Sequence, residues 1–153
     1  MSVKKSKIDE VKVKIQRISS LAKIPNYQHI GDAGADVCSI LDCTIKPFER
    51  KAIPTGLKVD IPIGYEIQVR SRSGLAINDG LFVLNSPGTI DSGFRGEIQI
   101  ILMNVSERNY DVRIGQRIAQ LVLKPVLNAI FEETDSLSES PRGNRGFGST
   151  GEK

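Results

Sequence analysis

The sequence has 153 residues, of which 39% are hydrophobic and 25% are charged, which is the composition of one ordinary globular domain. A chain of about 150 residues buries enough surface to need no disulfide or metal staple. The formal net charge of +3 is too small to indicate nucleic-acid binding. Because the sequence shows no apolar run of membrane length, secretory signal or lipidation motif, we expect no membrane association and a cytoplasmic location.

The cysteines and the single histidine give little reactive chemistry. Cys38 and Cys43 have no histidine pair to complete a zinc site, so we expect two free thiols. His29 stands in a polar, loop-like stretch and is interpreted as a surface residue. Any general base is therefore expected to be a carboxylate.

Apolar and polar residues alternate with a period of two along much of the chain, which indicates half-buried strands. Turn signals containing Pro, Gly, Asn and Asp separate these segments, so the pattern favours an all-β sandwich, jelly roll or barrel. One short helix is expected around residues 74–78. The alternating segments are 11–15, 57–61, 65–69, 98–102 and 110–114.

Residues 81–84 and 100–103 are continuous apolar runs, which predict strands buried on both faces. In so small a domain the second face can be covered by another subunit, so these runs give a hypothesis of an oligomer.

The composition changes after Phe131. Residues 132–141 are acidic, serine-rich and nearly without apolar side chains, so we expect a domain over residues 1–131 and a flexible linker over 132–141. Residues 142–153 then form a C-terminal lid segment in this interpretation.

The stretch from Arg70 to Ala76 follows a predicted strand and begins the predicted helix. Arg72 carries a fork of donors that suits phosphate, Ser73 adds a hydroxyl, and Gly74 lets backbone N–H groups approach closely. The alternative is an ordinary strand-to-helix turn capped by Ser73.

The loop at residues 85–97 lies between two apolar strands and reads as an unusually long hairpin, a type of loop that is often functional. Its candidate site residues are Asn85, Gly88, Thr89, Ile90, Asp91 and Phe94. Asp91 is a candidate general base for water, and its alternative role is to form a turn as an Asx residue.

Two further polar side chains stand near small or apolar residues. Asp36 follows Gly34 and Ala35 and is a candidate ligand, through water, of a hydrated Mg²⁺, while its alternative is a loop closing onto a strand. Gln120 shares a strand face with Ile118 and Val122, a placement that needs a hydrogen-bond partner.

The C-terminal segment at residues 142–151 contains four glycines, two arginines and one Phe. A disordered terminus is the alternative. However, Phe147 has no core to join and can stack on a base, while Arg142, Ser149 and Thr150 offer donors to phosphate. A segment that orders over a ligand in this way acts as a lid.

Taken together and in order, these stretches resemble the five motifs of the trimeric dUTP pyrophosphatase (dUTPase) family. The similarity spans roughly Ile24 to Gly151. The matching segments are Ala33-Gly34-Ala35-Asp36, Arg72-Ser73-Gly74-Leu75-Ala76, Gly88-Thr89-Ile90-Asp91 with Phe94-Arg95-Gly96, Arg117-Ile118-Ala119-Gln120-Leu121, and Arg142-Gly143 with Gly146-Phe147-Gly148-Ser149-Thr150-Gly151.

The resemblance implies a distorted jelly-roll or β-clip-like barrel with one short helix and a flexible glycine-rich C-terminal tail. It also implies a homotrimer with three shared active sites, each closed by a tail from a neighbouring subunit. The implied reaction is Mg²⁺-dependent hydrolysis of dUTP to dUMP and pyrophosphate by attack of water on the α-phosphate. Such an activity limits uracil in DNA and supplies dUMP for thymidylate synthesis.

The resemblance also implies a role for each matching residue. Asp91 orients the attacking water, Asp36 lies near the hydrated metal, and Phe94 lies under the sugar where the family usually has Tyr. The hairpin reads uracil, and Phe147 stacks on it. The implied phosphate contacts are Arg72, Ser73, Gly74 and Gln120, with Arg142, Gly148, Ser149 and Thr150 from the tail.

This sequence departs from the family at Phe94, at Ser71, where Pro is frequent, and at Asn144-Arg145, which replaces a smaller pair. Two alternatives stay open: a dCTP deaminase-type enzyme, and a non-catalytic nucleotide-binding module on the same fold. The deaminase needs a Glu in the base pocket and further helices, neither of which is evident. The presence of Asp91 disfavours the binding module.

Overall fold

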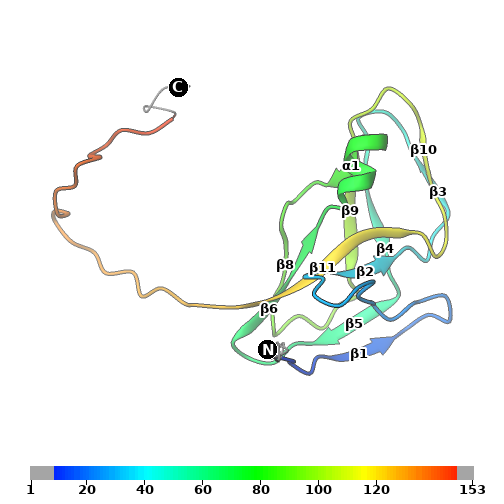
Figure 1. Ribbon diagram of the computed structural model, residues 1–153, viewed down its shortest axis with the longest axis horizontal. Coiled ribbons are helices and arrows are strands. Elements are labelled where there is room, and N and C mark those ends of the chain that lie inside the picture. The colour runs from blue at the N-terminus through cyan, green and yellow to red at the C-terminus, as the bar shows by residue number, and fades with distance from the viewer. Residues whose placement is uncertain (1–8, 148–153) are drawn as a thin grey trace, which may run out of the picture.

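The computed structural model describes residues 9–147, and its regular secondary structure consists of β-strands and one short helix (Figure 1). Eleven strands and one helix follow one another in these residues. They are β1 (Lys14–Arg17), β2 (Ala35–Cys38), β3 (Cys43–Ile45), β4 (Arg50–Pro54), β5 (Leu57–Asp60), β6 (Tyr65–Arg70), α1 (Ser73–Asp79), β7 (Leu81–Val83), β8 (Gly88–Ile90), β9 (Gln99–Asn104), β10 (Tyr110–Val112) and β11 (Arg117–Pro125). The expected all-β fold with one short helix is confirmed.

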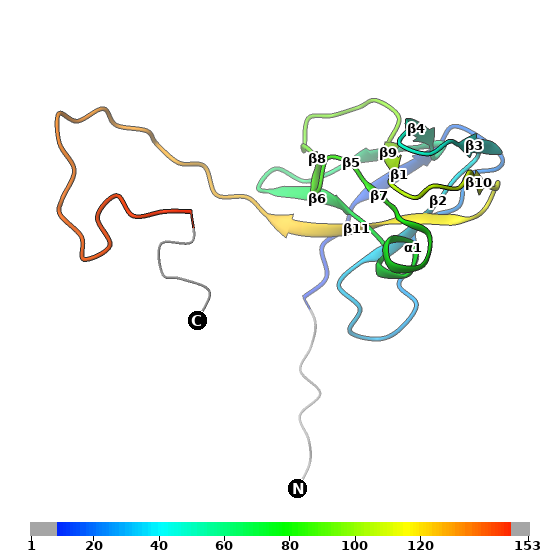
Figure 2. The ribbon, with the colours of Figure 1, turned by 90° about the horizontal axis from the view of Figure 1, so that it is seen from above.

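The strands form four small antiparallel sheets. The largest has the order β2-β11-β6-β8, and a second has the order β4-β9-β7. Two strand pairs, β1-β5 and β10-β3, complete the described part of the chain. The nine residues of β11 lie between β2 and β6, so this strand joins segments from both halves of the chain (Figure 2).

The core is aliphatic and draws on all four sheets. Side chains that are 0% exposed come from several different strands, which is the consequence of the period-two pattern: one face of each strand points inward. The apolar ones are Val37, Ile45, Ile53, Leu57, Ile100, Val112 and Ala119.

The two continuous apolar runs were expected to be buried on both faces, but within a single chain only one face of each strand is buried. Leu81 and Val83 are buried, but Phe82 between them is only half-buried, and Leu84 is 42% exposed. Burial in β9 alternates in the same way. The outer faces of β7 and β9 therefore carry apolar side chains that this chain covers only in part.

The helix begins one residue earlier than expected and is not capped by Ser73. Arg72 occupies the N-cap position without a side-chain capping bond, and Ser73 is the first helical residue. Gly80 ends the helix at a φ of 66°, a conformation that glycine adopts without strain. Every residue of α1 is at least partly exposed, so both Ser73 and Gly74 face outward.

The last contacts of the chain with the domain come before residue 131. The expected domain boundary at residue 131 stays a prediction. The strand β11 ends at Pro125, and the amide of Val126 still donates to the carbonyl of Gly64 at 2.9 Å. Beyond that bond, residues 126–147 form a C-terminal arm that extends away from the domain in both ribbon views (Figures 1 and 2). Within residues 9–147, no helix is long and apolar enough to cross a membrane.

Candidate active site

A cavity of about 300 Å³ opens beside the long hairpin. All six hairpin residues singled out from the sequence line it. The lining residues are Ala52, Val69, Asn85, Gly88, Thr89, Ile90, Asp91, Phe94, Glu97, Ile98, Gln99 and Ile101. Mixed apolar and polar lining of this kind, in a cavity of this size, is typical of small-molecule sites.

The cavity forms because the two ends of the hairpin and its middle belong to different sheets. At the ends, β7 pairs with β9, whereas β8 in the middle pairs with β6. The contact with β6 is close: a Cβ atom on Gly88 would lie 3.2 Å from the Cβ of Val69. A side chain at this position would crowd Val69, so glycine suits the point where β8 crosses to the other sheet. Sequence reasoning predicted the long hairpin but not this crossing.

The turn that follows β8 carries Asp91 and Phe94. The amide of Phe94 donates to the main-chain carbonyl of Asp91 at 3.1 Å, so the turn bond uses the backbone of Asp91 and leaves its carboxylate available. This geometry disfavours the Asx-turn alternative. The ring of Phe94 lies over Gly96, where a Cβ atom would come within 2.5 Å of the ring.

A second polar group surrounds the buried Asp36. Its side chain is only 5% exposed, and Nε of Arg72 lies 3.2 Å from Oδ1 while Nη1 of Arg117 lies 3.1 Å from Oδ2. Arg117 makes a hydrogen bond, but Arg72 makes an ion pair without one, so Oδ1 is buried without a hydrogen-bond partner. Two arginines held by one buried carboxylate form a compact source of positive charge suited to an anion.

The role of Arg117 was missed by sequence reasoning, which placed it only on a strand. It contacts Asp36 across 81 residues of sequence, and no local pattern reports such a pair. Arg117 also accepts a hydrogen bond at its main-chain carbonyl from Nη1 of Arg72, at 3.2 Å. The three side chains therefore form one unit.

Gln120 lies beside this unit. In β11 it is opposite Asp36 on one side and Arg70 on the other, two residues before Arg72. Its side chain packs on Gly34, where a Cβ atom would lie 3.2 Å from Oε1 of Gln120. Among the hydrogen bonds of residues 9–147, none involves the side chain of Gln120, so its polar end keeps its capacity for a ligand.

The structure thus places the predicted site residues in two groups. Asp36, Arg72 and Gln120 are brought together, with Ser73 and Gly74 at the exposed start of α1. None of these five lines the hairpin cavity.

The cysteines and the histidine stand as expected. Both cysteines are free thiols, and His29 is on the surface with a side chain that is 84% exposed. Burial raises the pKa of Cys38, the charge of Lys23 opposing this, so the thiol next to β11 is neutral at pH 7.

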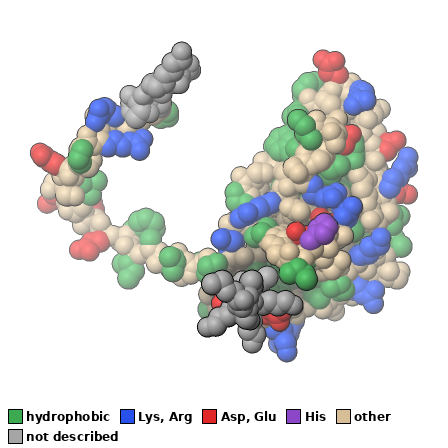
Figure 3. Space-filling model, in the orientation of Figure 1, with side chains coloured by type: hydrophobic (Ala, Val, Ile, Leu, Met, Phe, Trp, Pro, Cys, Tyr) green, Lys and Arg blue, Asp and Glu red, His purple; other side chains and the backbone are tan. Residues whose placement is uncertain are grey.

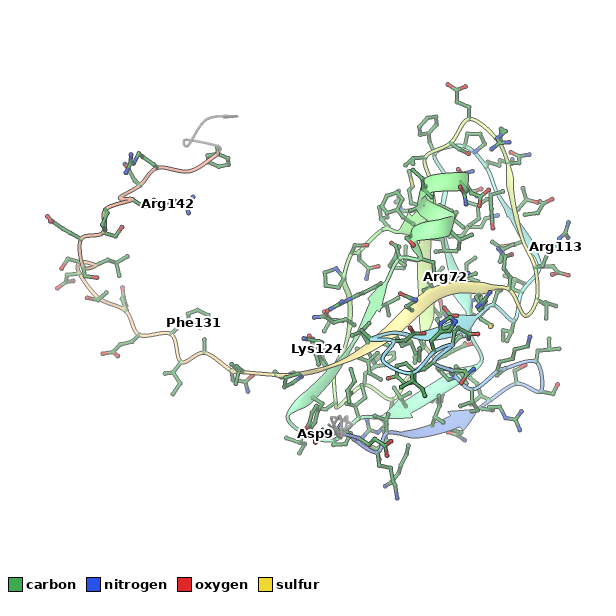
Figure 4. The ribbon with its side chains drawn as sticks, viewed as in Figure 1. Asp9, Arg72, Arg113, Lys124, Phe131 and Arg142 are labelled. Atoms are coloured by element: carbon green, nitrogen blue, oxygen red, sulfur yellow. The ribbon has the colours of Figure 1, made fainter. Side chains whose placement is uncertain are left out.

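The C-terminal arm contributes none of its described residues to either group. Phe147 is fully exposed, and Arg142 and Arg145 donate to carbonyls of the arm itself. Figure 4 shows Phe131 and Arg142 far along the arm from Arg72, and Figure 3 shows the arm standing clear of the domain. The expected contacts of Gly148, Ser149 and Thr150 lie outside the described residues.

The fold and these two groups define an all-β domain in which a small cavity is accompanied by clustered arginines, a combination suited to a nucleotide. The sequence profile of the dUTPase family matches residues 20–151. The chain belongs to the dUTPase family.

Bacterial relatives are similar over nearly their whole length. The deoxyuridine 5'-triphosphate nucleotidohydrolase of Clostridium novyi (strain NT) is 49% identical over 141 residues, which are 92% of this chain and 99% of that protein. The protein of the same name from Nautilia profundicola is 50% identical over the same shares of the two chains.

Solved structures of phage dUTPases share the fold. The Staphylococcus bacteriophage 80alpha dUTPase with dUpNHpp has a TM-score of 0.85 at 28% identity, covering 92% of this chain and 98% of that one. These neighbours confirm the jelly-roll-like β fold. A point mutant of the dUTPase from phage phi11 of S. aureus, with a TM-score of 0.76 at 24% identity over 82% of this chain and 98% of its own, is described with a structural Mg(II) ion.

Proposed function

We propose that the protein hydrolyses dUTP to dUMP and pyrophosphate, by attack of water on the α-phosphate. The observation that carries this proposal is the hairpin cavity, in which the available carboxylate of Asp91 and the ring of Phe94 stand together beside the backbone of β8. The family, and the name shared by relatives at about 50% identity, support the same substrate.

Asp91 is the general base in this mechanism. Its carboxylate accepts a hydrogen bond from the attacking water, orients the water toward the α-phosphorus, and removes its proton as the new P–O bond forms. The pyrophosphate then leaves from the opposite side. A positioned base of this kind typically contributes about 10²–10⁴-fold in rate.

The hairpin selects the nucleoside. Asn85 and the polar backbone groups of Gly88–Ile90 face the edge of uracil, and a base with the wrong donors leaves buried polar groups unpaired, which costs heavily. The ring of Phe94, supported by Gly96, fills the space that a ribose 2′-OH would need. The missing phenol of Phe94 leaves this steric role intact.

The arginine unit binds the triphosphate. Arg72 is held by Asp36 and by the carbonyl of Arg117, so its guanidinium reaches the phosphates with little loss of side-chain entropy. Ser73, Gly74 and Gln120 add donors beside it. Charge neutralisation of this kind supplies most of the catalysis in phosphoryl transfer.

Mg²⁺ is the proposed cofactor, and the residues present fit an ion held mainly by phosphates and water. Within residues 9–147 no three His, Cys, Asp or Glu side chains come together as a protein cage. Asp36 is buried and paired to two arginines, so only an indirect contact through water suits it. When bound, Mg²⁺ supplies neutralisation of the triphosphate charge.

We propose that the enzyme is a homotrimer with three shared sites. The half-buried apolar side chains on the outer faces of β7 and β9 need a cover, and a second copy of the chain supplies one. The arm extends away from its own domain and Phe147 is fully exposed, which supports the proposal that Phe147 and Arg142 close a neighbour's site.

Pyrophosphate release from a panel of deoxynucleotides tests the proposal. With Mg²⁺, dUTP should be hydrolysed far faster than dCTP, dTTP or UTP, and a chelator should stop the reaction. Release of ammonia from dCTP would instead support the deaminase alternative. Binding of dUTP without pyrophosphate would support the non-catalytic module.

A further inference from the structure

We propose that Asp60 of β5 is a positioning residue for deoxyribose selection, acting through Arg95 on the hairpin turn that carries Asp91 and Phe94. This inference rests on the proposed function. Asp60 lines none of the hairpin cavity, and it lies 35 residues from Arg95 in sequence.

Arg95 ties the hairpin turn together from within. One nitrogen, Nη1, donates to the carbonyl of Ser92 at 2.7 Å and to that of Phe94 at 3.0 Å. Ser92 follows Asp91 directly, so the guanidinium closes the short loop between the proposed base and the proposed sugar-contacting ring. The position of both side chains therefore depends on where this guanidinium is held.

Asp60 holds that guanidinium. The other nitrogen, Nη2, donates to Oδ1 of Asp60 at 2.6 Å. The planar fork of arginine lets one side chain serve the loop and the strand at once, which the ammonium of lysine cannot do in the same geometry. We call this set of contacts the turn clamp; it consists of Asp60, Arg95 and the carbonyls of Ser92 and Phe94.

Strand β5 is a firm support for this clamp. Val59 and Ile61, on either side of Asp60, are 4% and 2% exposed, so the backbone that carries the carboxylate is fixed by the core. The residue before this strand holds the hairpin as well, because the amide of Gly56 donates to Oε1 of Glu97 at 2.8 Å.

The exposure of the clamp argues against a large contribution to folding stability. The side chains of Arg95 and Asp60 are 58% and 44% exposed, and ion pairs between exposed groups contribute little to folding stability. A small displacement of a reacting group can nevertheless cost about 100-fold in rate. We therefore expect loss of the clamp to change substrate choice more than melting temperature.

The experiment compares Asp60→Ala, which removes the acceptor of the Arg95 hydrogen bond, with Lys14→Gln. Lys14 is the other cation beside Asp60, at 3.5 Å, and it makes no hydrogen bond or ion pair to the hairpin turn, so Lys14→Gln is a matched control. The readout is the ratio of kcat/KM for dUTP to kcat/KM for UTP. Both substrates carry the same triphosphate, so effects of salt and metal cancel in this ratio. Asp60→Ala should lower the ratio about tenfold, and Lys14→Gln should leave it unchanged.

Two further variants test whether Asp60 acts through Arg95. Arg95→Lys keeps the charge and loses the fork, so it should lower the ratio as well. Adding Asp60→Ala to Arg95→Lys should then cause little further loss, because both changes break the same contact. Asp60→Glu should restore most of the ratio.

An unchanged ratio in Asp60→Ala would overturn the proposed role of the clamp. Equal losses of kcat/KM with both substrates, together with a lower melting temperature, would also overturn it. A folded wild-type protein that does not hydrolyse dUTP would refute the proposed function instead. In that event, calorimetry on the same variants tests the clamp without any need for turnover. The clamp predicts a lower preference for dUMP over UMP, measured as the ratio of the two affinities.

Discussion

The hairpin at residues 85–97 and the C-terminal arm at residues 126–147 both carry residues expected to bind the nucleotide, but they are held in different ways. The hairpin is fixed at β8 by pairing with β6. It is also held by the contact of Arg95 with Asp60, the last residue of β5, and by that of Glu97 with the residue before β5. The arm has its last described bond to the domain at Val126. Beyond it, Leu127, Ile130 and Phe131 are each more than 90% exposed.

This difference separates the part of the proposed site that is already formed in one chain from the part that needs a ligand or a neighbouring subunit. In the proposed function, the hairpin cavity recognises uracil and deoxyribose with residues whose positions are already fixed within a single chain. An arm that binds only itself gains order from a ligand or a neighbouring subunit, at a cost in entropy. Such a division suits a lid, which must open again to release product.

The largest expected effect comes from the hairpin. Asp91→Asn removes the proposed base while keeping the size of the side chain, so kcat for dUTP should fall by about 10²–10⁴-fold. The affinity for dUTP should stay within about tenfold, because the phosphates and the base are bound elsewhere. Steady-state kinetics and calorimetry with a non-hydrolysable analogue measure the two quantities. Equal losses in both would assign Asp91 to binding alone.

Removal of residues 142–153 tests the arm in the same assay. Turnover should fall roughly 100-fold because the open site admits water and positions the phosphates less well. The melting temperature and the sedimentation coefficient should change little, since Arg142 and Phe147 touch no part of their own domain. A fully active truncated enzyme would show that the arm is not a lid.

Gly96→Ala tests the ring of Phe94 within the hairpin. The new methyl group would come within 2.5 Å of the ring, and because Phe94 is 44% exposed the ring can move aside at a cost of less than about 1 kcal/mol. The preference for dUTP over UTP should drop about tenfold. Gly93→Ala is the control, since a Cβ atom there meets nothing within 4 Å. If both variants prefer dUTP over UTP to the same extent, Phe94 has no role in sugar selection.

The smallest expected effect is a change in protease sensitivity. Trypsin should cut after Arg142 and Arg145 in the exposed arm well before it cuts after Arg95, which the turn clamp holds. Addition of Mg²⁺ and a non-hydrolysable dUTP analogue should slow cleavage of the arm several-fold by mass action. Mass spectrometry of the fragments follows both rates. Unchanged cleavage with the ligand would place the arm outside the closed site.

Local patterns accounted for much of the fold. The period-two segments became β5, β6, β9 and β10, and the helix formed at the one place where turn chemistry favoured it. The bounds of the first strand were predicted least accurately. Alternation begins at Val11, whereas pairing begins at Lys14, where β5 offers a partner. Strand boundaries depend on such partners, which the local sequence does not contain.

Some parts of the candidate site were predicted from the sequence and others were not. The hairpin residues were identified together and do line one cavity. The contacts of Arg117 and Arg95 were not foreseen, because each joins residues that are far apart in sequence. The roles of Arg142 and Phe147 stay predictions, as their proposed partners belong to other chains.

The strand pattern, the short helix and the groups that carry chemistry could be predicted from the sequence, because they depend on side-chain periodicity and residue type. Three features came from the fold: β8 leaves the sheet of its hairpin, Asp36 pairs with two arginines, and Asp60 contacts Arg95 of the turn. Those features arise where strands from different parts of the chain meet, and their energies depend on distances that close packing sets.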